Sequence, residues 1–398
     1  MELSIAEVYN AQQVLRDVAA HPTLVPTNLL EDTEVFLKPE CLQHTGSFKL
    51  RGAYYKISQL TPEEKSRGVI ACSAGNHAQG VALGATHNGI KALICLPAGA
   101  PISKVEATKR FGAEVCLVDG VYDDAYAKAI ELRDKHGYTF VHPFDDPLVI
   151  AGQGTIGLEI LEMLPDVDVI VVPVGGGGLI SGVAFAAKTL NPNIRVYGVQ
   201  AAGAPSMADS IHSGEPVHLP SVSTIADGIA VKAPGENTYE MCRKYVDDIV
   251  TVTDDQIADA ILWLMEKQKL VSEGAGAVSV AAVKSGLIPD IKGKKVVCIV
   301  SGGNIDVNTL NRVMTRGLKV GGRLATLTVD LADKPGQLSA VCGVISQNGG
   351  NIITVTHERV DTRAQINGCT IRLELETRNH EHIEQIRKAL TESGFNVL

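Results

Sequence analysis

Apolar positions between residues 34 and 300 follow two alternating patterns. Short runs of β-branched and aliphatic residues predict strands, and longer segments with an apolar residue every three or four positions predict helices. The expected strands are Glu34–Leu37, Gly68–Cys72, Lys91–Leu96, Glu114–Leu117, Asp168–Val174, Arg195–Gln200, Asp248–Val252 and Lys295–Val300. The expected helices include Gln79–His87, Ser103–Phe111, Asp123–Lys135, Ile180–Leu190, Asp255–Lys267 and Ala275–Ser285. Continuously apolar strands separated by helices are typical of parallel sheets covered on both faces, which predicts the α/β class.

The pattern changes after a basic, glycine-bearing segment, residues 315–323, that we expect to be a linker. The later segments are predicted to be a strand, a helix, two strands, a helix and a strand: Ala325–Leu331, Gly336–Asn348, Asn351–Val360, Gln365–Glu376, Glu381–Ser393 and Gly394–Leu398. This βαββαβ order is ferredoxin-like, and such a unit can fold alone. We therefore expect one domain over residues 1–320 and a second over residues 323–398.

Composition and charge exclude several classes of protein. The chain has 398 residues, which at roughly 100–200 residues per domain allows two or three domains. With 45 acidic and 36 basic residues the formal net charge is −9, so we expect neither a nucleic acid nor an anionic membrane as partner. The longest apolar stretch, residues 167–187, contains Pro173 and four glycines and does not fit a membrane span. The eight cysteines are scattered and the N-terminus lacks signal-peptide features, so we expect a cytoplasmic protein with reduced thiols.

A first chemical motif runs from Ser47 to Gly52 and places Lys49 between Phe48 and Leu50. An apolar surrounding is a poor place for a solvated charge, and partial burial favours a neutral, nucleophilic amine able to form a Schiff base. A lysine that only begins a helix is the alternative.

A second motif, residues 73–80, follows the strand that ends at Cys72 and precedes a helix of small residues. A Ser-Ala-Gly-Asn turn at a helix N-terminus directs unpaired N–H groups at one point, which suits a carboxylate. Ordinary helix capping by Ser73 or Asn76 is the alternative.

A third motif is the run of four glycines, Gly175–Gly178, between an expected strand and an expected helix. Residues without Cβ let the backbone wrap around an oxyanion at a helix N-terminus, so a phosphate is the expected ligand. A dinucleotide site fits poorly, because the spacing is not G-x-G-x-x-G and the next strand ends in Gln200 rather than an acidic residue. A P-loop is excluded, because no Gly-Lys-Ser/Thr follows.

A fourth motif, Ser301-Gly-Gly-Asn304, ends the last strand of the α/β pattern. A serine at the carboxyl end of such a strand can direct its hydroxyl into the crevice where α/β proteins bind ligands. Zinc-ligand spacing and the G-x-S-x-G elbow are both absent from the sequence, and we expect no metal site.

Taken in this order, the four motifs resemble the fold-type-II pyridoxal-phosphate enzymes and most closely the threonine ammonia-lyases. The resemblance covers nearly the whole chain and includes residues 151–157, 224–228 and 272–276, while residues 333–338 are similar to the first turn of an ACT regulatory domain. It implies two open, mostly parallel sheets with covering helices, a small lobe at about 47–142 inserted in a large lobe, and a βαββαβ ACT domain.

The resemblance also implies roles for individual residues. Lys49 is the expected catalytic residue, which forms the Schiff base with pyridoxal 5′-phosphate and acts on the Cα proton of the substrate. Phe48 would pack against the cofactor ring, Asn76 would bind its 3′-hydroxyl, and Ser301 would face its pyridine nitrogen. The phosphate would bind at Gly175, Gly176, Gly177, Gly178 and Leu179. The substrate would contact Ser73, Ala74, Gly75, His77 and Glu273.

The implied reaction is deamination of L-threonine to 2-oxobutanoate and ammonia, with L-serine as a slower substrate that gives pyruvate. A neutral Ser301 does little to keep the pyridine nitrogen protonated, which favours elimination over transamination. Serine racemase or a serine-preferring deaminase is the alternative, although racemases of this fold carry a serine where this chain has Ala74. An amino-acid-sensing binding protein is the alternative of another class, and the intact Lys49 argues against it.

The tail is expected to bind an effector, either isoleucine, valine or a nucleotide, between ACT domains of a homo-oligomer, a dimer or a tetramer. That role suits an enzyme of isoleucine biosynthesis, whereas a purely oligomerising module is the alternative. The divalent-cation site of the related racemases is not expected, because residues 200–210 offer only Asp209.

Overall fold

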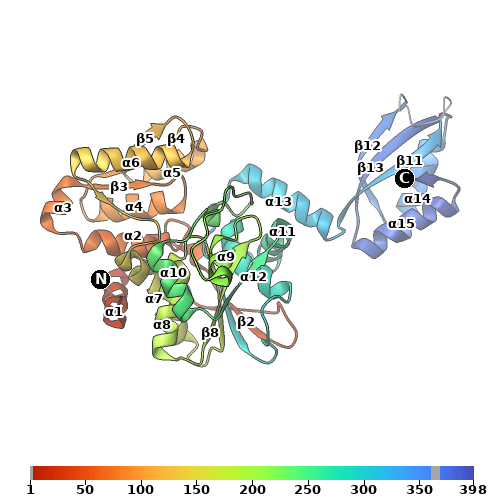
Figure 1. Cartoon of the computed structure of the whole chain (residues 1–398). Coiled ribbons are helices and arrows are strands. Elements are labelled where there is room, and N and C mark those ends of the chain that lie inside the picture. The colour runs from red at the N-terminus through yellow and green to blue at the C-terminus, as the bar shows by residue number, and fades with distance from the viewer. Residues whose placement is uncertain (1–2, 360–367) are drawn as a thin grey trace. The chain divides into compact units, whose positions relative to one another are not determined.

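The computed structural model describes residues 3–359 and 368–398. The chain forms two compact units, Met1–Val307 and Asn308–Leu398, and Figure 1 follows it through both. Each unit is described by itself.

The first unit contains a six-stranded sheet in the order β1-β2-β10-β7-β8-β9. All neighbouring strands in it are parallel except the pair β1 and β2. The bounds are β1 Val25–Thr27, β2 Glu34–Lys38, β7 Val169–Pro173, β8 Arg195–Ala201, β9 Asp248–Val252 and β10 Lys295–Ile299. Strands β7 and β10 are almost entirely buried, as expected for the centre of a covered sheet.

A second sheet of the same unit is fully parallel and has the order β5-β4-β3-β6. Its strands are β3 Val69–Cys72, β4 Ala92–Pro97, β5 Glu114–Val118 and β6 Thr139–Phe140. They lie in the sequence between β2 and β7. The prediction of two mostly parallel sheets is therefore confirmed, although the sequence pattern did not predict the short strands β1 and β6.

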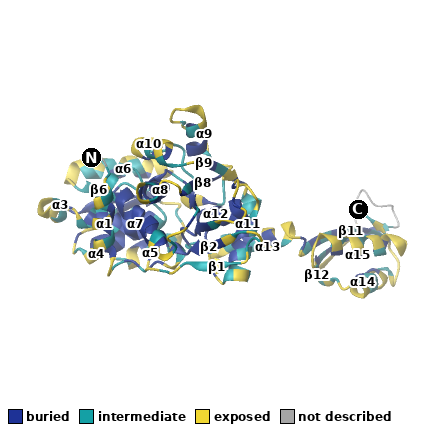
Figure 2. Cartoon of the chain, turned by 90° about the horizontal axis from the view of Figure 1, so that it is seen from below, coloured by how far each residue is buried: buried dark blue, intermediate teal, exposed yellow. Residues whose placement is uncertain are grey.

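Helices surround both sheets. Their bounds are α1 Ile5–Leu15, α2 Lys49–Ser58, α3 Pro62–Arg67, α4 Asn76–His87, α5 Ile102–Arg110, α6 Tyr122–His136, α7 Pro147–Met163, α8 Gly178–Leu190, α9 Ser206–Ser213, α10 Glu236–Tyr245, α11 Asp254–Trp263 and α12 Gly274–Lys284. Shorter segments are the 3-10 turns η1 Glu40–Leu42 and η2 Asp227–Ile229 and a π-helical segment, Leu264–Gln268. Helix α7 is buried from Val149 to Ile160, and Figure 2 shows it inside the first unit. Its N-terminus is capped by Asp146, whose carboxylate accepts the N–H groups of Leu148 and Val149.

Glycines bring three of these helices into backbone contact. A Cβ on Gly152 of α7 would lie 2.6 Å from the Cα of Gly52 on α2, and a Cβ on Gly182 of α8 would lie 2.6 Å from the backbone nitrogen of Gly154 on α7. No side chain fits at these points. The spacing of α2, α7 and α8 is therefore set by the main chain.

The second unit has the predicted βαββαβ order. It begins with α13 Val307–Val320 and continues with β11 Leu324–Ala332, α14 Gln337–Gln347, β12 Asn351–Glu358, β13 Gly368–Glu376, α15 His380–Glu392 and β14 Asn396–Val397. The antiparallel sheet has the order β12-β13-β11-β14. Both α14 and α15 contribute to one core with the alternate residues of β11 and β13. The predicted strand ends at residues 360 and 365–367 lie outside the described residues.

The prediction of a linker at residues 315–323 is wrong for most of that segment. Helix α13 runs through it to Val320, and only the Gly321–Gly322 turn interrupts the chain before β11. The residues Leu310, Val313 and Gly317 recur every three or four positions and are at least partly buried, which is a helical pattern. One glycine costs a helix only about 1 kcal/mol, so Gly317 does not end it. Gly322, with φ +65°, follows where the helix stops.

A membrane span is not found in the described part of the chain. None of its helices is both long enough and apolar enough to cross a bilayer.

Candidate active site

One cavity of about 730 Å³ in the first unit collects all of the site residues that the sequence predicts. They come from the start of α2, the β3–α4 junction, the β7–α8 loop, the residue before α12 and the second residue after β10. The set is Phe48, Lys49, Ser73, Ala74, Gly75, Asn76, His77, Gly175, Gly176, Gly177, Gly178, Leu179, Glu273 and Ser301. Parallel strands of a sheet end at one edge, which explains why motifs so far apart in sequence meet here.

Lys49 is the first residue of α2, and its amine lies in the cavity wall. The Nζ atom donates a hydrogen bond to the carbonyl oxygen of Pro143 at 2.6 Å and lies 5.3 Å from the centroid of the Phe48 ring. Burial of the ammonium group lowers the pKa of Lys49 to about 8, although the nearby Glu273 carboxylate acts in the opposite direction. A fraction on the order of a tenth of this amine is therefore unprotonated and nucleophilic at pH 7.

The glycine loop joins β7 to α8 and exposes a row of main-chain donors. Among the described residues, nothing accepts the N–H groups of Gly176, Gly177, Gly178 or Leu179. A Cβ on Gly176 would lie 2.5 Å from the Phe144 ring, and Gly177 has φ +96°, so side chains are excluded here. Free N–H groups at the start of a helix form a site for an anion, and the helix dipole adds to the attraction.

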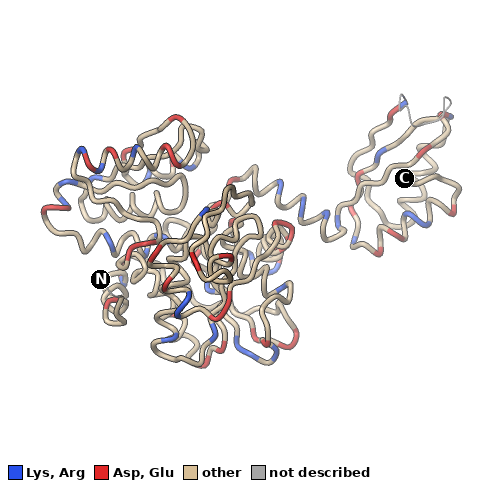
Figure 3. Tube along the Cα trace, viewed as in Figure 1, with Lys and Arg blue, Asp and Glu red and all other residues tan. Residues whose placement is uncertain are grey.

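The charges of the cavity support anion binding by the main chain. The side chains that line it include three lysines, Lys49, Lys104 and Lys232, and three acids, Asp123, Asp227 and Glu273. Figure 3 shows the same mixture of Lys and Arg with Asp and Glu along both units. The amides of the glycine loop, rather than a basic patch, are therefore the group in the cavity that is best suited to an anion.

Asn76 is held by a chain of hydrogen bonds that fixes the direction of its side-chain amide. Asn304 donates from Nδ2 to the carbonyl oxygen of Thr45 at 2.7 Å and to Oδ1 of Asn76 at 2.8 Å. Because a carbonyl oxygen only accepts, Asn304 must present its amino group to both partners. Asn76 then donates from Nδ2 to Oε1 of Glu273 at 2.6 Å. The second N–H of that amino group is left for a ligand.

Glu273 is nearly buried between Asn76 and Gly302. Burial and the Asp227 carboxylate raise the pKa of Glu273 to about 7, against the opposing effects of the Asn76 hydrogen bond, Lys104 and Lys49. The carboxyl group therefore exchanges its proton near neutral pH.

The β3–α4 junction offers main-chain donors beside a neutral imidazole. The Nε2 atom of His77 lies 2.8 Å from the carbonyl oxygen of Val141, and burial lowers the pKa of His77 to about 3, with a further contribution from Lys49. The ring is therefore uncharged at neutral pH, with its proton on Nε2. Gly75 has open space above it, and its N–H group is bound to Oγ of Ser73 at 3.1 Å.

Ser301 and Phe48 meet where β10 ends. The N–H group of Phe48 donates to the carbonyl oxygen of Ser301 at 3.1 Å, and the Ser301 hydroxyl makes only a long contact, 3.4 Å, with the carbonyl oxygen of Ala275. This hydroxyl is a neutral group at the cavity wall.

Sequence reasoning missed other lining residues, among them Lys104, His142, Phe144, Asp227 and Asn304. Asn304 lay inside the fourth motif, but nothing in the sequence placed it beside Asn76. Phe144 and His142 belong to a segment without strand or helix pattern, where Nδ1 of His142 accepts the N–H group of Asp145 at 2.7 Å. The contact between Asn304 and Asn76 depends on tertiary packing, which no local pattern reports.

Comparisons with known proteins identify the family of the chain. The family model described as pyridoxal-phosphate dependent enzyme matches residues 21–302, and an ACT domain model matches residues 325–395. The L-threonine ammonia-lyase of Thermotoga maritima is 49% identical over 99% of both chains.

Solved structures give the same result for the fold. Threonine deaminase isoform 2 of Solanum lycopersicum is 39% identical, with a TM-score of 0.74 over 78% of this chain and 88% of that one. Maize serine racemase is 36% identical, with a TM-score of 0.74 over 80% of this chain and 99% of that one. The match with the ammonia-lyase covers 99% of this chain and therefore includes the residues matched by the ACT domain model. The chain therefore belongs to the pyridoxal-phosphate dependent enzymes and, among them, to the L-threonine ammonia-lyases that carry a C-terminal ACT domain.

Proposed function

We propose that the chain deaminates L-threonine to 2-oxobutanoate and ammonia and converts L-serine more slowly to pyruvate. The observation that carries this proposal is the meeting of a buried, low-pKa lysine and an unpartnered glycine loop in one cavity. The relatives named L-threonine ammonia-lyase support threonine as the substrate.

The residues present fit pyridoxal 5′-phosphate. The amides of Gly175–Leu179 would hold its phosphate, in a cradle that a Cβ would fill, and Phe48 would pack beside its ring. The free N–H of Asn76 would bind the 3′-hydroxyl and Ser301 would face the pyridine nitrogen. When bound, the cofactor supplies an electron sink that stabilises negative charge on the substrate Cα.

Lys49 would act both as the residue to which the cofactor attaches and as the base toward the substrate. Its neutral amine is the nucleophile that the cofactor requires, and once released it takes up the proton of the substrate Cα. A pKa of about 8 keeps both protonation states of the amine accessible near neutral pH.

The substrate would be held at the start of α4 and beside Glu273. The N–H group of Ala74, for which the described residues offer no acceptor, suits its carboxylate, whereas the N–H groups of Ser73 and Gly75 are already bound. The neutral His77 adds no positive charge there. Glu273 presents a carboxyl group that carries a proton below a pH of about 7 and is therefore able to donate to the hydroxyl group of the substrate.

The test is to measure 2-oxobutanoate release and cofactor attachment in the same protein. Incubation with pyridoxal 5′-phosphate and borohydride is expected to modify Lys49, as read by peptide mass spectrometry. The Lys49→Ala variant should remain folded and lose deamination by at least about 1000-fold, because it lacks both nucleophile and base. A wild-type protein that leaves Lys49 unmodified would overturn the proposal.

Serine racemisation is the second candidate, since maize serine racemase shares the fold at 36% identity. Ala74 lines the cavity and has no group that could act as a second base beside Lys49, so we propose that racemisation is slow. Chiral chromatography after incubation with L-serine should show pyruvate in large excess over D-serine. Equal amounts of the two products would favour the racemase.

The ACT domain supports control by a small amino acid. We propose that the effector is isoleucine or valine, with a nucleotide as the alternative. It would bind between copies of this domain in a homo-dimer or homo-tetramer. The proposed catalytic domain spans residues 1–320, with a small lobe at about 47–142 inserted in it, and the proposed regulatory domain spans residues 323–398. The eight cysteines are all free, which supports a reducing, cytoplasmic location. We also propose a place in isoleucine biosynthesis.

A further inference from the structure

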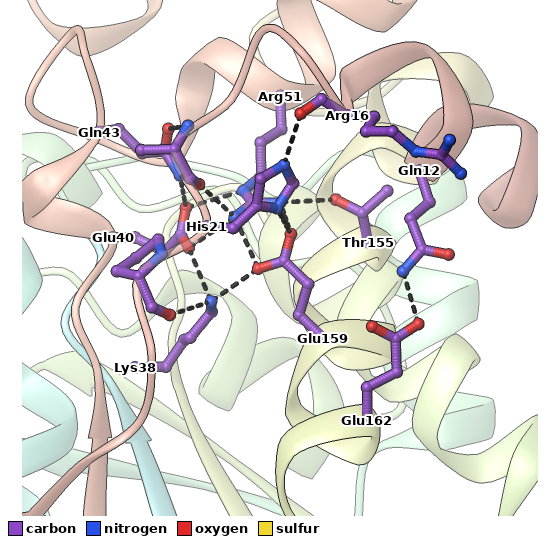
Figure 4. Close-up of polar contacts among 12 residues, drawn as sticks. Gln12, Arg16, His21, Lys38, Glu40, Gln43, Arg51, Thr155, Glu159 and Glu162 are labelled. Atoms are coloured by element: carbon purple, nitrogen blue, oxygen red, sulfur yellow. Dashed lines mark hydrogen bonds and ion pairs between the residues drawn. The ribbon is translucent and has the colours of Figure 1, made fainter.

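A group of buried charges lies directly behind the turn that carries Lys49. We call Lys38, Glu40, Arg51 and Glu159 the charge cluster; Figure 4 shows them with their polar neighbours. Lys38, Glu40 and Arg51 are fully buried, and Glu159 is 3% exposed. Two positive and two negative charges balance inside the first unit. Arg51 stands two residues after Lys49, in the same turn of α2.

Arg51 uses its whole guanidinium group in this cluster. It forms a fork with Glu40, with Nε to Oε2 at 2.8 Å and Nη2 to Oε1 at 2.9 Å. It binds Glu159 through Nη1 to Oε1 at 2.5 Å and Nη2 to Oε2 at 2.9 Å, and Nη1 also donates to Oγ1 of Thr155 at 3.1 Å. A planar fork of five donors makes this set of bonds, and a lysine cannot reproduce it.

The partners of Arg51 belong to the elements that build the rest of the cavity. Glu40 follows β2, whose neighbour β10 ends at Ile299, two residues before Ser301. Glu159 lies on α7, which touches α8 through Gly154 and Gly182, and α8 begins at the glycine loop. Lys38 closes the group by donating to Glu159 at 2.6 Å. The cluster thus ties the first turn of α2 to both the Ser301 side and the phosphate side of the cavity.

Stability alone does not explain such a cluster. The removal of two ion pairs from water costs several kcal/mol per ion, and apolar residues of similar volume often stabilise a protein equally well. Buried charges can instead select one arrangement of the elements that they join. Here that arrangement includes the residue on which the proposed chemistry depends.

We propose that Arg51 is a positioning residue, which fixes the first turn of α2 between β2 and α7 and thereby holds the Lys49 amine at one place relative to Ser301 and the glycine loop. This inference rests on the role proposed for Lys49. A displacement of about 1 Å at a reacting group can cost on the order of 100-fold in rate.

The test compares full-length variants that keep the cluster neutral. In Arg51→Met/Glu40→Gln one pair of charges is removed, and in Arg51→Lys the charge stays while the fork is lost. The first readout needs no turnover: the rate at which pyridoxal 5′-phosphate with cyanoborohydride modifies Lys49, followed by peptide mass spectrometry. The second is kcat and KM for L-threonine. Lys56→Met is the matched control. Lys56 also lies on α2 and forms an ion pair at 2.9 Å with Asp146, the N-cap of α7, but it is two helical turns away from Lys49.

We expect the double variant to modify Lys49 about 10- to 100-fold more slowly and to lose kcat by a similar factor with little change in KM. Arg51→Lys should show a smaller loss of the same kind, and Lys56→Met should match the wild type. If the double variant does not fold, the modification rate and kcat of Arg51→Lys alone test the inference. Folded variants with wild-type modification rates and kcat would overturn the inference, whereas a wild-type protein whose Lys49 is never modified would overturn the proposed function instead.

Discussion

At the scale of single residues, the cavity holds a lysine and a glutamate whose pKa values are displaced toward each other. The pKa of Lys49 falls to about 8 and that of Glu273 rises to about 7, in both cases mainly because burial disfavours the charged form. Each group also stabilises the charge of the other. Near neutral pH both are therefore able to give or take a proton.

Replacement of Glu273 by Gln should lower the pKa of Lys49 further. Above a pH of about 7 the carboxylate is charged and favours the ammonium form, so its removal favours the neutral amine. The pH at which modification of Lys49 by pyridoxal 5′-phosphate reaches half its maximal rate should move below about 8. Glu106→Gln, an exposed change on α5, serves as control. An unchanged midpoint in Glu273→Gln would contradict the coupling.

Replacement of Gly177 by Ala should weaken cofactor binding. The residue has φ +96°, and a Cβ there would lie 2.5 Å from Cε of Met207 and 2.8 Å from Cβ of Thr238. Left-handed backbone costs other residues roughly 1–2 kcal/mol, and any shift of the loop misdirects its N–H groups. We expect at least about tenfold weaker binding of pyridoxal 5′-phosphate by absorbance titration.

Gly214→Ala is the matched control for that variant. Gly214 has φ +83° but nothing within 4 Å of a Cβ, and it lies at the end of α9. It should lose a similar amount of stability while binding the cofactor normally. Equal losses of affinity in both variants would show that strain, rather than the shape of the loop, is responsible.

At the scale of elements, two ion pairs at the cavity connect helices α5 and α6 with residues 227–232, which follow β8 and α9 in the sequence. Lys104 of α5 pairs with Asp227 at 2.5 Å, and Lys232 pairs with Asp123 of α6 at 3.3 Å. All four side chains line the cavity. Partly exposed pairs of this kind contribute roughly 0–1 kcal/mol, which is enough to influence substrate binding.

The Lys232→Gln variant should therefore raise KM for L-threonine about two- to fivefold, with a smaller effect of added salt on KM than in the wild type. Steady-state kinetics at low and high ionic strength measure both effects. Lys128→Gln removes a comparable pair, with Glu131, inside α6 and should change neither. A wild-type KM in Lys232→Gln would mean that this pair does not act on the substrate.

The same scale shows why the sequence predicted some elements and missed others. Strands such as Asp248–Val252 have a run of apolar residues with clear ends, and the prediction matches the structure. Strands β1 and β6 have three and two residues, too few for a pattern, and exist because a neighbouring strand pairs with them. Helix α13 was mistaken for a linker because glycine and basic residues outweighed its apolar spacing. Within the site, motifs next to strand ends were predictable, but Asn304 and Phe144 were not, because their partners are distant in sequence.

At the scale of the whole chain, the two units have separate cores. The core of the second unit draws on residues from Ala325 to Val397, and the larger cores of the first unit draw on none of them. Each unit is therefore expected to keep its fold when the other is altered.

A chain that ends at residue 307, where the first unit ends, should accordingly keep L-threonine deamination within about a factor of three and lose its response to isoleucine and valine. The measurement is the keto-acid assay with and without each amino acid, in the full chain and in the truncated one. A truncated enzyme that still responds would place the effector site in the first unit.

The glycine contacts between α2, α7 and α8 have a consequence for how the site tolerates change. Because these helices touch through main-chain atoms, the distance between Lys49 on α2 and the glycine loop before α8 does not depend on the size of any side chain between them. Apolar substitutions elsewhere in the first unit can repack without stretching it. The helices thus act as a fixed spacer, and the chemistry of the cavity should survive wide variation in the core around it.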